Sequence, residues 1–330
     1  MIWLQFLIAA AVIVLAGTRL ARYGDVLGEK TGLGRSWIGV VLLAATTSLP
    51  ELVAGFGATA LSPLPDLAVG NVLGACMFNL LILSAMDAIN PEPIGARALH
   101  GHALSIGFGL LLLGIAGLGL LAGAAMPSVG WVGLYTPMLV AVYFVAIRVI
   151  FMHERHQRAR ETQEVAEELQ YAGISVRVAG LRYAGAAALV VGAALWLPGL
   201  GADLARQTGL GEAFVGSVFM AITTSLPEIV VSLAAVRLGA IDLGIGNVLG
   251  SIMFNLLILG LDDVFYRQGP LLAAADPSHG VTILAVVAMN ALFLIGLTYR
   301  VMTKRFVVTW DTGAMAAVYA AAVSLVYLLR

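Results

Sequence analysis

The six residues TTSLPE occur twice in hydrophobic surroundings, at 46–51 and again at 223–228. In each copy a Thr and a Ser precede the Glu by four and three residues, so the three side chains fall on roughly one face of a helix. The proline lacks an N–H and frees the carbonyl four residues earlier. Such oxygens suit hard cations, whereas zinc and copper favour His and Cys. The predicted ligands are Thr46, Thr47, Ser48, Glu51, Thr223, Thr224, Ser225 and Glu228.

A second stretch is repeated after each TTSLPE. GNVLGACMFNLLIL (70–83) matches GNVLGSIMFNLLIL (246–259). Both copies carry glycines at GxxxG spacing, which allows helices to approach closely in a membrane. Since Gly is common in membrane helices, we interpret this spacing as packing.

Amides recur at equivalent positions of these two stretches. We expect Asn79 and Asn255 to add oxygen ligands, and Ser251 a hydroxyl, whereas Asn71 and Asn247 would bond neighbouring helices. The alternative is that all four amides only join helices.

The composition places the chain in a membrane. Of its 330 residues 60% are hydrophobic and only 11% are charged, against about 25% charged in soluble domains. The single cysteine, Cys76, excludes an internal disulfide. The expected partners are the lipid bilayer and inorganic cations, with neither nucleic acid nor a cofactor; oligomeric state is not predicted.

Ten segments are long and apolar enough to span a bilayer, which takes about 20 residues each. The predicted fold class is therefore an all-α polytopic membrane protein with ten transmembrane helices. The segments are about 2–20, 36–60, 67–87, 101–123, 128–150, 179–199, 211–236, 241–261, 280–299 and 308–329.

The basic residues predict the orientation, because Lys and Arg gather on the cytoplasmic side. With the N-terminus outside, only Arg206, Arg267 and Arg330 of the 18 Lys and Arg residues lie outside. Both termini are then outside. The polar stretch 153–177 becomes a cytoplasmic linker; a regulatory role for it is the weaker alternative.

Five spans precede this linker, so the second half begins on the opposite side of the membrane. The halves, 1–152 and 178–330, are therefore predicted to be inverted repeats, with the TTSLPE and GNVLG elements at about 36–87 and 211–261. In transporters of this kind, ion sites lie near the midplane between broken helices.

Two acids are predicted to lie deep in the hydrocarbon. A charge there costs roughly 2.5–3.5 kcal/mol on insertion scales, yet no Lys or Arg is placed to pair with Glu51 or Glu228. A protonated, purely structural carboxyl is the alternative to a cation ligand. The remaining acids near the spans are predicted at span ends: Asp66, Asp87, Glu212, Asp242 and Asp262.

With both motifs present in inverted halves, the chain resembles the calcium/cation antiporter superfamily, close to prokaryotic sodium/calcium exchangers. The resemblance implies two inverted five-helix halves, with ion sites formed by the second and third helix of each. It implies that Glu51 and Glu228 bind Ca²⁺ and Na⁺ alternately, and that Ala44 and Ala221 lend backbone carbonyls. It also implies an integral protein of a prokaryotic inner (plasma) membrane.

The chain departs from that family's pattern at three places, one of which is the position where Asn is frequent and this chain has Cys76 or Ile252. Ala75 stands where Ser is usual, although the second copy has Ser251. Sodium/calcium exchangers typically pair Asn with Asp at the last motif position, whereas here both are Asn, at 79 and 255. Two carboxylates balance one Ca²⁺ or two monovalent cations, so a third Na⁺ lacks a counter-charge.

The sequence therefore favours a secondary antiporter that exchanges Ca²⁺ for Na⁺ by alternating access. Exchange of Ca²⁺, or another divalent cation, for H⁺ through the same glutamates is the alternative. A channel is less favoured, because one chain with inverted halves has the wrong symmetry for a pore. An intramembrane enzyme is disfavoured because Ser48 and Ser225 have no nearby histidine or aspartate base in the predicted spans.

Overall fold

The structure, a computed structural model, describes residues 2–61, 63–98, 101–161, 171, 173–208, 224–299, 301–304 and 307–328. Helices make up nearly all of these residues, with one short hairpin. The elements of the first half and linker are α1 (Ile2–Thr31), α2 (Arg35–Trp37), η1 (Ile38–Leu43), α3 (Ala44–Thr47), α4 (Leu49–Phe56), η2 (Gly57–Leu61), α5 (Pro65–Ile89), α6 (Ile94–Arg97), α7 (His102–Ala122), η3 (Gly123–Ala125), β1 (Ser128–Val129), β2 (Val132–Gly133) and α8 (Tyr135–Glu161). Those of the second half are α9 (Val176–Thr208), α12 (Leu226–Arg237), α13 (Ile241–Phe265), α14 (Leu271–Ala274), α15 (His279–Tyr299) and α16 (Trp310–Leu328).

Eight of the described helices are long and apolar enough to cross a membrane. A bent pair, Arg35–Thr47 with Leu49–Leu61, forms a further candidate span. These confirm a polytopic helical membrane protein. The predicted span 211–236 begins outside the described residues, which resume at 224 and contain α12, so the count of ten remains a prediction.

Two predicted boundaries are wrong. Helix α1 continues to Thr31 rather than ending near residue 20, whereas the candidate span Val176–Trp196 agrees with the predicted 179–199, although α9 itself continues to Thr208. Hydropathy detects where a helix leaves lipid, but the helix itself can continue into water with polar residues. In the predicted span 128–150 the helix begins only at Tyr135. Residues 128–133 instead form the β1–β2 hairpin around Gly130, whose φ of 64° suits glycine.

The polar stretch after the first half is partly helical, since α8 runs to Glu161. Further along this stretch, Tyr171 contacts the end of α1. Its hydroxyl donates to Asp25 (2.9 Å) and its N–H to Glu29 (3.0 Å). Asp25 also pairs with Arg35 at 2.5 Å. The predicted linker is therefore attached to the first helix.

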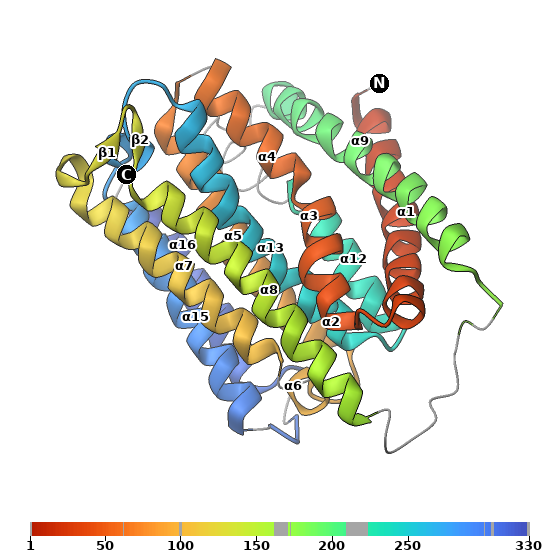
Figure 1. Cartoon of the computed structure of the whole chain (residues 1–330). Coiled ribbons are helices and arrows are strands. Elements are labelled where there is room, and N and C mark those ends of the chain that lie inside the picture. The colour runs from red at the N-terminus through yellow and green to blue at the C-terminus, as the bar shows by residue number, and fades with distance from the viewer. Residues whose placement is uncertain are drawn as a thin grey trace.

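Figure 1 shows α5 and α13 inside the helix bundle, between α3 and α4 on one side and α7, α8, α15 and α16 on the other. Buried side chains of α5, α7, α8, α13 and α15 form one continuous core. Helices α1 and α9 run side by side along one flank and share a second apolar cluster with η1 and α12. The GNVLG helices thus occupy the best-buried position in the molecule.

The GxxxG glycines of α13 have the packing role that we expected. A Cβ on Gly250 would lie 2.6 Å from the carbonyl carbon of Val40, and one on Gly246 would lie 2.7 Å from the carbonyl oxygen of Ser36. Only glycine permits so close an approach of the η1 backbone. By the repeat, the equivalent partners of Gly70 and Gly74 fall within 209–223, outside the described residues.

An aspartate anchors the C-terminal end of each GNVLG helix. Asp87 and Asp263 occupy equivalent positions in the repeat, and both are fully buried. The donors to Asp87 are the N–H groups of Ile94 and Thr309, the hydroxyls of Thr309 and Thr312, and the Lys304 ammonium (3.1 Å). Those to Asp263 are the N–H groups of Leu271 and Gly133 and the hydroxyls of Thr136 and Tyr135. Each aspartate therefore fixes the end of its helix to the start of the final span of the other half, α16 for Asp87 and α8 for Asp263.

Candidate cation site

Both copies of TTSLPE break their helix at the serine. Ser48 has φ −90° and ψ 10°, and Ser225 has φ −87° and ψ 8°. In each copy a new helix begins at the following leucine, with the proline in its first turn. In the first copy the two helical pieces meet at 41°. The proline therefore interrupts the helix as predicted, immediately before the glutamate.

The two breaks meet at one place and exchange hydrogen bonds. Ser48 Oγ donates to Glu228 Oε1 at 3.0 Å, and Ser225 Oγ donates to Glu51 Oε1 at 3.4 Å. All four side chains are fully buried. Such reciprocal contacts between equivalent residues are the mark of a two-fold axis. Each half thus supplies the serine that contacts the other half's glutamate.

Polar atoms without partners surround these serines. The second carboxylate oxygen, Oε2, of Glu51 and of Glu228 has no hydrogen-bond partner among the described residues. The same holds for both amide atoms of Asn79 and of Asn255. A buried polar group without a partner is unusual and needs an explanation such as an ion or water. Two carboxylates and two amides, from α4, α5, α12 and α13, are therefore available to ligands.

Thr47 and the other two amides join the helices around the site. Thr47 Oγ1 lies 3.3 Å from Asn247 Oδ1 and 3.5 Å from Ser251 Oγ. Asn247 Nδ2 donates to Ser232 Oγ at 3.0 Å, and Asn71 Nδ2 donates to the backbone oxygen of Glu51 at 3.2 Å. Asn71 and Asn247 thus bridge helices, as the sequence suggested.

Of the other predicted ligands, the Thr46 hydroxyl and the Ala44 carbonyl make hydrogen bonds to residues other than the two glutamates. The Thr46 hydroxyl bonds Leu42 O (2.8 Å) and the hydroxyl of Tyr183 on α9 (3.0 Å), so only its carbonyl is a candidate. The Ala44 carbonyl accepts from the N–H of Ser48 at 3.0 Å. Thr224 is buried. Ala221 and Thr223 fall outside the described residues.

One acid is more buried than the sequence suggests. Asp262 lies in the last turn of α13, near the predicted span end, and it is fully buried there. Hydropathy does not predict this burial, because two consecutive acids, Asp262 and Asp263, resemble the start of a loop. Within the part of the chain that the structure describes, no three His, Cys, Asp or Glu side chains gather closely enough to hold a metal ion. The central site therefore has two carboxylates.

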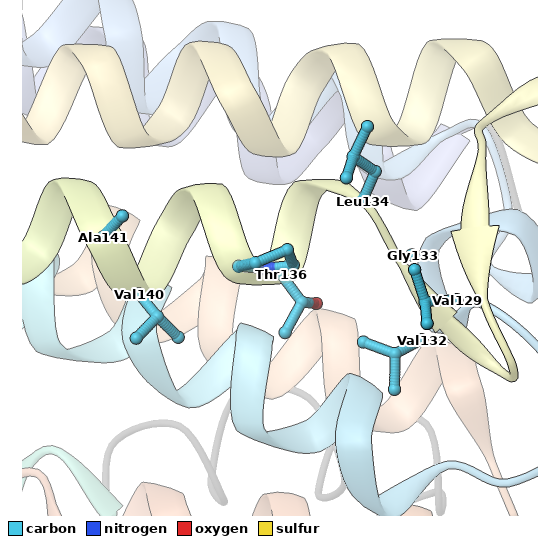
Figure 2. Close-up of a pocket in the computed structure, with 8 residues that line it drawn as sticks. Val129, Val132, Gly133, Leu134, Thr136, Val140 and Ala141 are labelled. Carbon is cyan, nitrogen blue, oxygen red and sulfur yellow. The ribbon is translucent and has the colours of Figure 1, made fainter.

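The surface hollow in Figure 2 lies elsewhere. It is lined by the β1–β2 hairpin and the start of α8, with mainly apolar side chains and the Thr136 hydroxyl. Gly133 and Thr136 of this lining donate to Asp263. The hollow contains no carboxylate of its own, and we assign it no role in cation binding.

Comparisons with known proteins agree with this geometry. The family model named Sodium/calcium exchanger protein matches residues 1–152 and 179–328. The inner membrane protein YrbG of Escherichia coli (strain K12) is 30% identical over 259 residues, covering 77% of each chain. The sodium/calcium exchanger MaX1 of Methanosarcina acetivorans is 32% identical over 136 residues, covering 41% of this chain and 36% of that relative.

Solved structures show the same fold. The sodium-calcium exchanger NCX_Mj, soaked with 10 mM Na⁺ and zero Ca²⁺, superposes with a TM-score of 0.76 over 98% of this chain and 99% of its own. The two sequences are 20% identical, so this likeness speaks for the architecture alone.

Proposed function

Because the chain belongs to the sodium/calcium exchanger protein family, and is thus a cation-exchanging membrane transporter rather than an enzyme, we propose that it exchanges Ca²⁺ for Na⁺. The exchange site would be the Glu51/Glu228 pair. Further oxygens would come from Asn79, Asn255 and Ser251. The remaining proposed ligands are Thr47, Ser48, Thr224 and Ser225 by their hydroxyls, and Ala44, Thr46, Ala221 and Thr223 by their carbonyls.

The observation that carries the proposal is the reciprocal pairing of Ser48 with Glu228 and Ser225 with Glu51. It brings two buried carboxylates to one place, each with an oxygen that has no partner among the described residues. Leaving such charges uncompensated in a dry interior is costly. A cation that joins the two halves would remove that cost, and Ca²⁺ accepts six to eight oxygen ligands.

Coupling follows from competition for this pair. Ca²⁺ and Na⁺ would occupy the same carboxylates in turn, so each crossing in one direction requires a counter-ion in the other. Inverted halves support alternating access, since exchanging their conformations turns the site from one face to the other. In this proposal 1–152 and 178–330 are the halves, both termini lie outside, and the linker 153–177 is cytoplasmic, in keeping with the distribution of Lys and Arg.

Exchange of Ca²⁺, or another divalent cation, for H⁺ is the second candidate. It is favoured by one observation: the central site offers two carboxylates where sodium/calcium exchangers typically have a third at position 255. A pair of carboxylates can carry two protons against one divalent cation without a third charge.

Transport by the purified protein in liposomes tests both candidates. We expect ⁴⁵Ca²⁺ uptake driven by an outward Na⁺ gradient at equal pH. Uptake driven only by a pH gradient would show that H⁺, and not Na⁺, is the ion exchanged for Ca²⁺. Uptake with neither gradient, rising linearly with Ca²⁺ concentration, would indicate a channel.

Removing either carboxylate should have the largest effect on transport. Glu51→Gln and Glu228→Gln each leave a divalent cation facing one charge in a buried site. Breaking a buried pair costs about 3–5 kcal/mol, so Ca²⁺ affinity should fall at least about 100-fold. Glu92→Gln, on an exposed loop residue, is the matched control and should transport normally. Normal exchange by both site variants would refute the assignment.

A further inference from the structure

Asp262 is a buried acid that the central site does not use. It lies in the last turns of α13 and is fully buried, and neither carboxylate oxygen has a hydrogen-bond partner among the residues that the structure describes. Its neighbour Asp263 contrasts with it, since that side chain accepts four hydrogen bonds. Asp262 therefore has no visible structural task.

The Asp262 carboxyl group packs against the helix that carries Glu51. A Cβ on Gly55 of α4 would lie 2.7 Å from Asp262 Cγ, so glycine is needed for the acid to fit there. Gly55 follows Glu51 by four residues, and side chains at that spacing share a face, about 5–6 Å apart. Asp262 likewise follows Asn255 by seven residues, or two turns, on one face of α13. It thus lies one turn of α4 beyond Glu51 and two turns of α13 beyond Asn255.

The other half lacks this acid. The repeat aligns Asp262 with Met86, whose methyl group packs where a Cβ on Gly244 would be, at 2.8 Å. The adjacent position is Asp in both halves, Asp87 and Asp263. Asp262 therefore makes the packing of α13 on α4 chemically different from the equivalent region of the other half.

The charge at the central site gives this difference a use. Glu51 and Glu228 balance one Ca²⁺ or two monovalent cations, and the family's third acid is replaced by Asn255. We propose that Asp262 is the missing third carboxylate, moved two turns along α13, and that it holds one monovalent cation, Na⁺ or H⁺, during the transport cycle. Three monovalent cations would then exchange for one Ca²⁺, with net movement of one charge. This inference rests on the proposed exchange function.

Few other ionisable groups face Asp262. On α4 the nearest is Glu51, one turn from Gly55. On its own helix Asp263 points to the N–H groups and hydroxyls of β2, α8 and α14 described above. The segment η2 (Gly57–Leu61), which also packs on α13, carries no acid or base. No described Lys, Arg or His pairs with Asp262, so a mobile cation is the available counter-charge.

The number of cations per Ca²⁺ can be measured in liposomes whose membrane potential is set by K⁺ and valinomycin. For the unmodified protein, we expect the potential of zero net ⁴⁵Ca²⁺ flux to correspond to three monovalent cations. Asp262→Asn should reduce this to two, which makes exchange electroneutral and Ca²⁺ flux independent of potential. Asp262→Glu should stay electrogenic. Varying the Na⁺ ratio at equal pH, and then the pH at equal Na⁺, identifies the third cation.

Asp311→Asn is the matched control. Asp311 is also buried with a carboxylate oxygen unpartnered in the described structure, but α16 packs on α5 and α15 rather than α4. It should keep the ratio of three. An unmodified protein that is electroneutral, or an Asp262→Asn variant that still moves net charge, would overturn the proposal.

A second measurement separates this inference from the proposed function. Infrared difference spectra, recorded when Na⁺ is added or the pH is changed without any gradient, report carboxyl groups directly. We expect one carboxyl band that is absent in Asp262→Asn and present in Asp311→Asn. If Ca²⁺ exchange fails but this band is found, the proposed substrate is wrong and the Asp262 site stands. If exchange is found without the band, the Asp262 site is wrong.

Discussion

The two halves of the molecule share a set of polar residues and differ at a few positions beside the candidate cation site. Both have the serine break, the buried glutamate, two amides and the anchoring aspartate. They also share a His–Asp pair at the start of equivalent helices, His102 with Asp242 and His279 with Asp66. They differ where Asp262 stands against Met86 and Ser251 against Ala75.

This difference separates two roles of polar residues, holding the helices in place and selecting ions. An alternating-access transporter with inverted repeats must form equivalent structures facing either side, so the residues that break, anchor and align its helices are needed in both halves. Residues present in only one half cannot serve that symmetry. In the proposed transport cycle, we expect such residues to affect which ions the site accepts. Substitutions of residues present in both halves therefore test the helix framework, meaning the breaks and anchors that set the helix positions. Substitutions of residues present in only one half test ion selectivity.

The anchoring aspartates should show the largest effect on stability. Asp87→Asn and Asp263→Asn each replace a buried carboxylate by a group that also donates, so at least one hydrogen bond to a charged acceptor is lost. Such bonds contribute about 1.5–3 kcal/mol each. We expect both variants to lose about 3 kcal/mol of unfolding free energy in detergent. Asp87→Asn should lose more, because it removes the carboxylate 3.1 Å from the Lys304 ammonium and leaves that largely buried charge with only the carbonyl oxygens of Asp87 and Asn90 as partners.

Thermal and denaturant unfolding of the two variants side by side measures this. Asp66→Asn, at an acid that is 60% exposed, controls for the loss of a charge. A large loss of stability in only one of the two variants would mean that Asp87 and Asp263 are not equivalent anchors. It would then be wrong to assign residues shared by both halves to the helix framework and unshared residues to ion selectivity.

The serines should show a smaller effect, on ion affinity. Ser48→Ala and Ser225→Ala each remove a hydroxyl that contacts the glutamate of the other half. Losing one such oxygen costs about 1 kcal/mol, which corresponds to roughly a five-fold weaker Ca²⁺ affinity. Ser48→Ala should be the more severe, because its bond to Glu228 is 3.0 Å long and the equivalent bond from Ser225 is 3.4 Å.

The half-saturating Ca²⁺ concentration for exchange gives the result, and Ser→Thr at each position, which keeps the hydroxyl, should restore much of the affinity. An unchanged affinity in both alanine variants would show that the reciprocal bonds only join the two halves and that the hydroxyls do not bind the cation.

The architecture was largely predictable because it depends on patterns that the sequence displays openly. Long apolar segments predicted the membrane helices that the structure contains, whereas the inverted five-span halves, which the repeated motifs and the odd number of spans predicted, remain a prediction. The ends were less predictable. The polar residues after position 20 continue α1 as a helix outside the apolar segment, and turn-forming glycines near 130 start a hairpin before α8.

The residues of the candidate site could be predicted from the sequence, but the hydrogen bonds between them could not. Repetition indicated that both TTSLPE copies contribute, but only the folded chain pairs Ser48 with Glu228 across the two halves. The burial of Asp262 could not be predicted for a related reason. Local hydropathy assigns an acid beside another acid to a loop, whereas its burial depends on Gly55, which is distant in sequence and leaves room for it.

The His–Asp pairs should give the smallest effect and the sharpest contrast between the halves. His102 Nε2 lies 2.9 Å from Asp242 and its side chain is fully buried, whereas His279 lies 3.3 Å from Asp66, which is 60% exposed. Exposed ion pairs contribute little, while a buried hydrogen bond contributes about 1 kcal/mol. We therefore expect His102→Gln to lower the unfolding free energy by about 1 kcal/mol and His279→Gln by less than about 0.5 kcal/mol. Since the same pair occurs in both halves, equal losses would mean that its geometry matters more than its burial, and the pairs would then belong with the anchoring aspartates as parts of the helix framework.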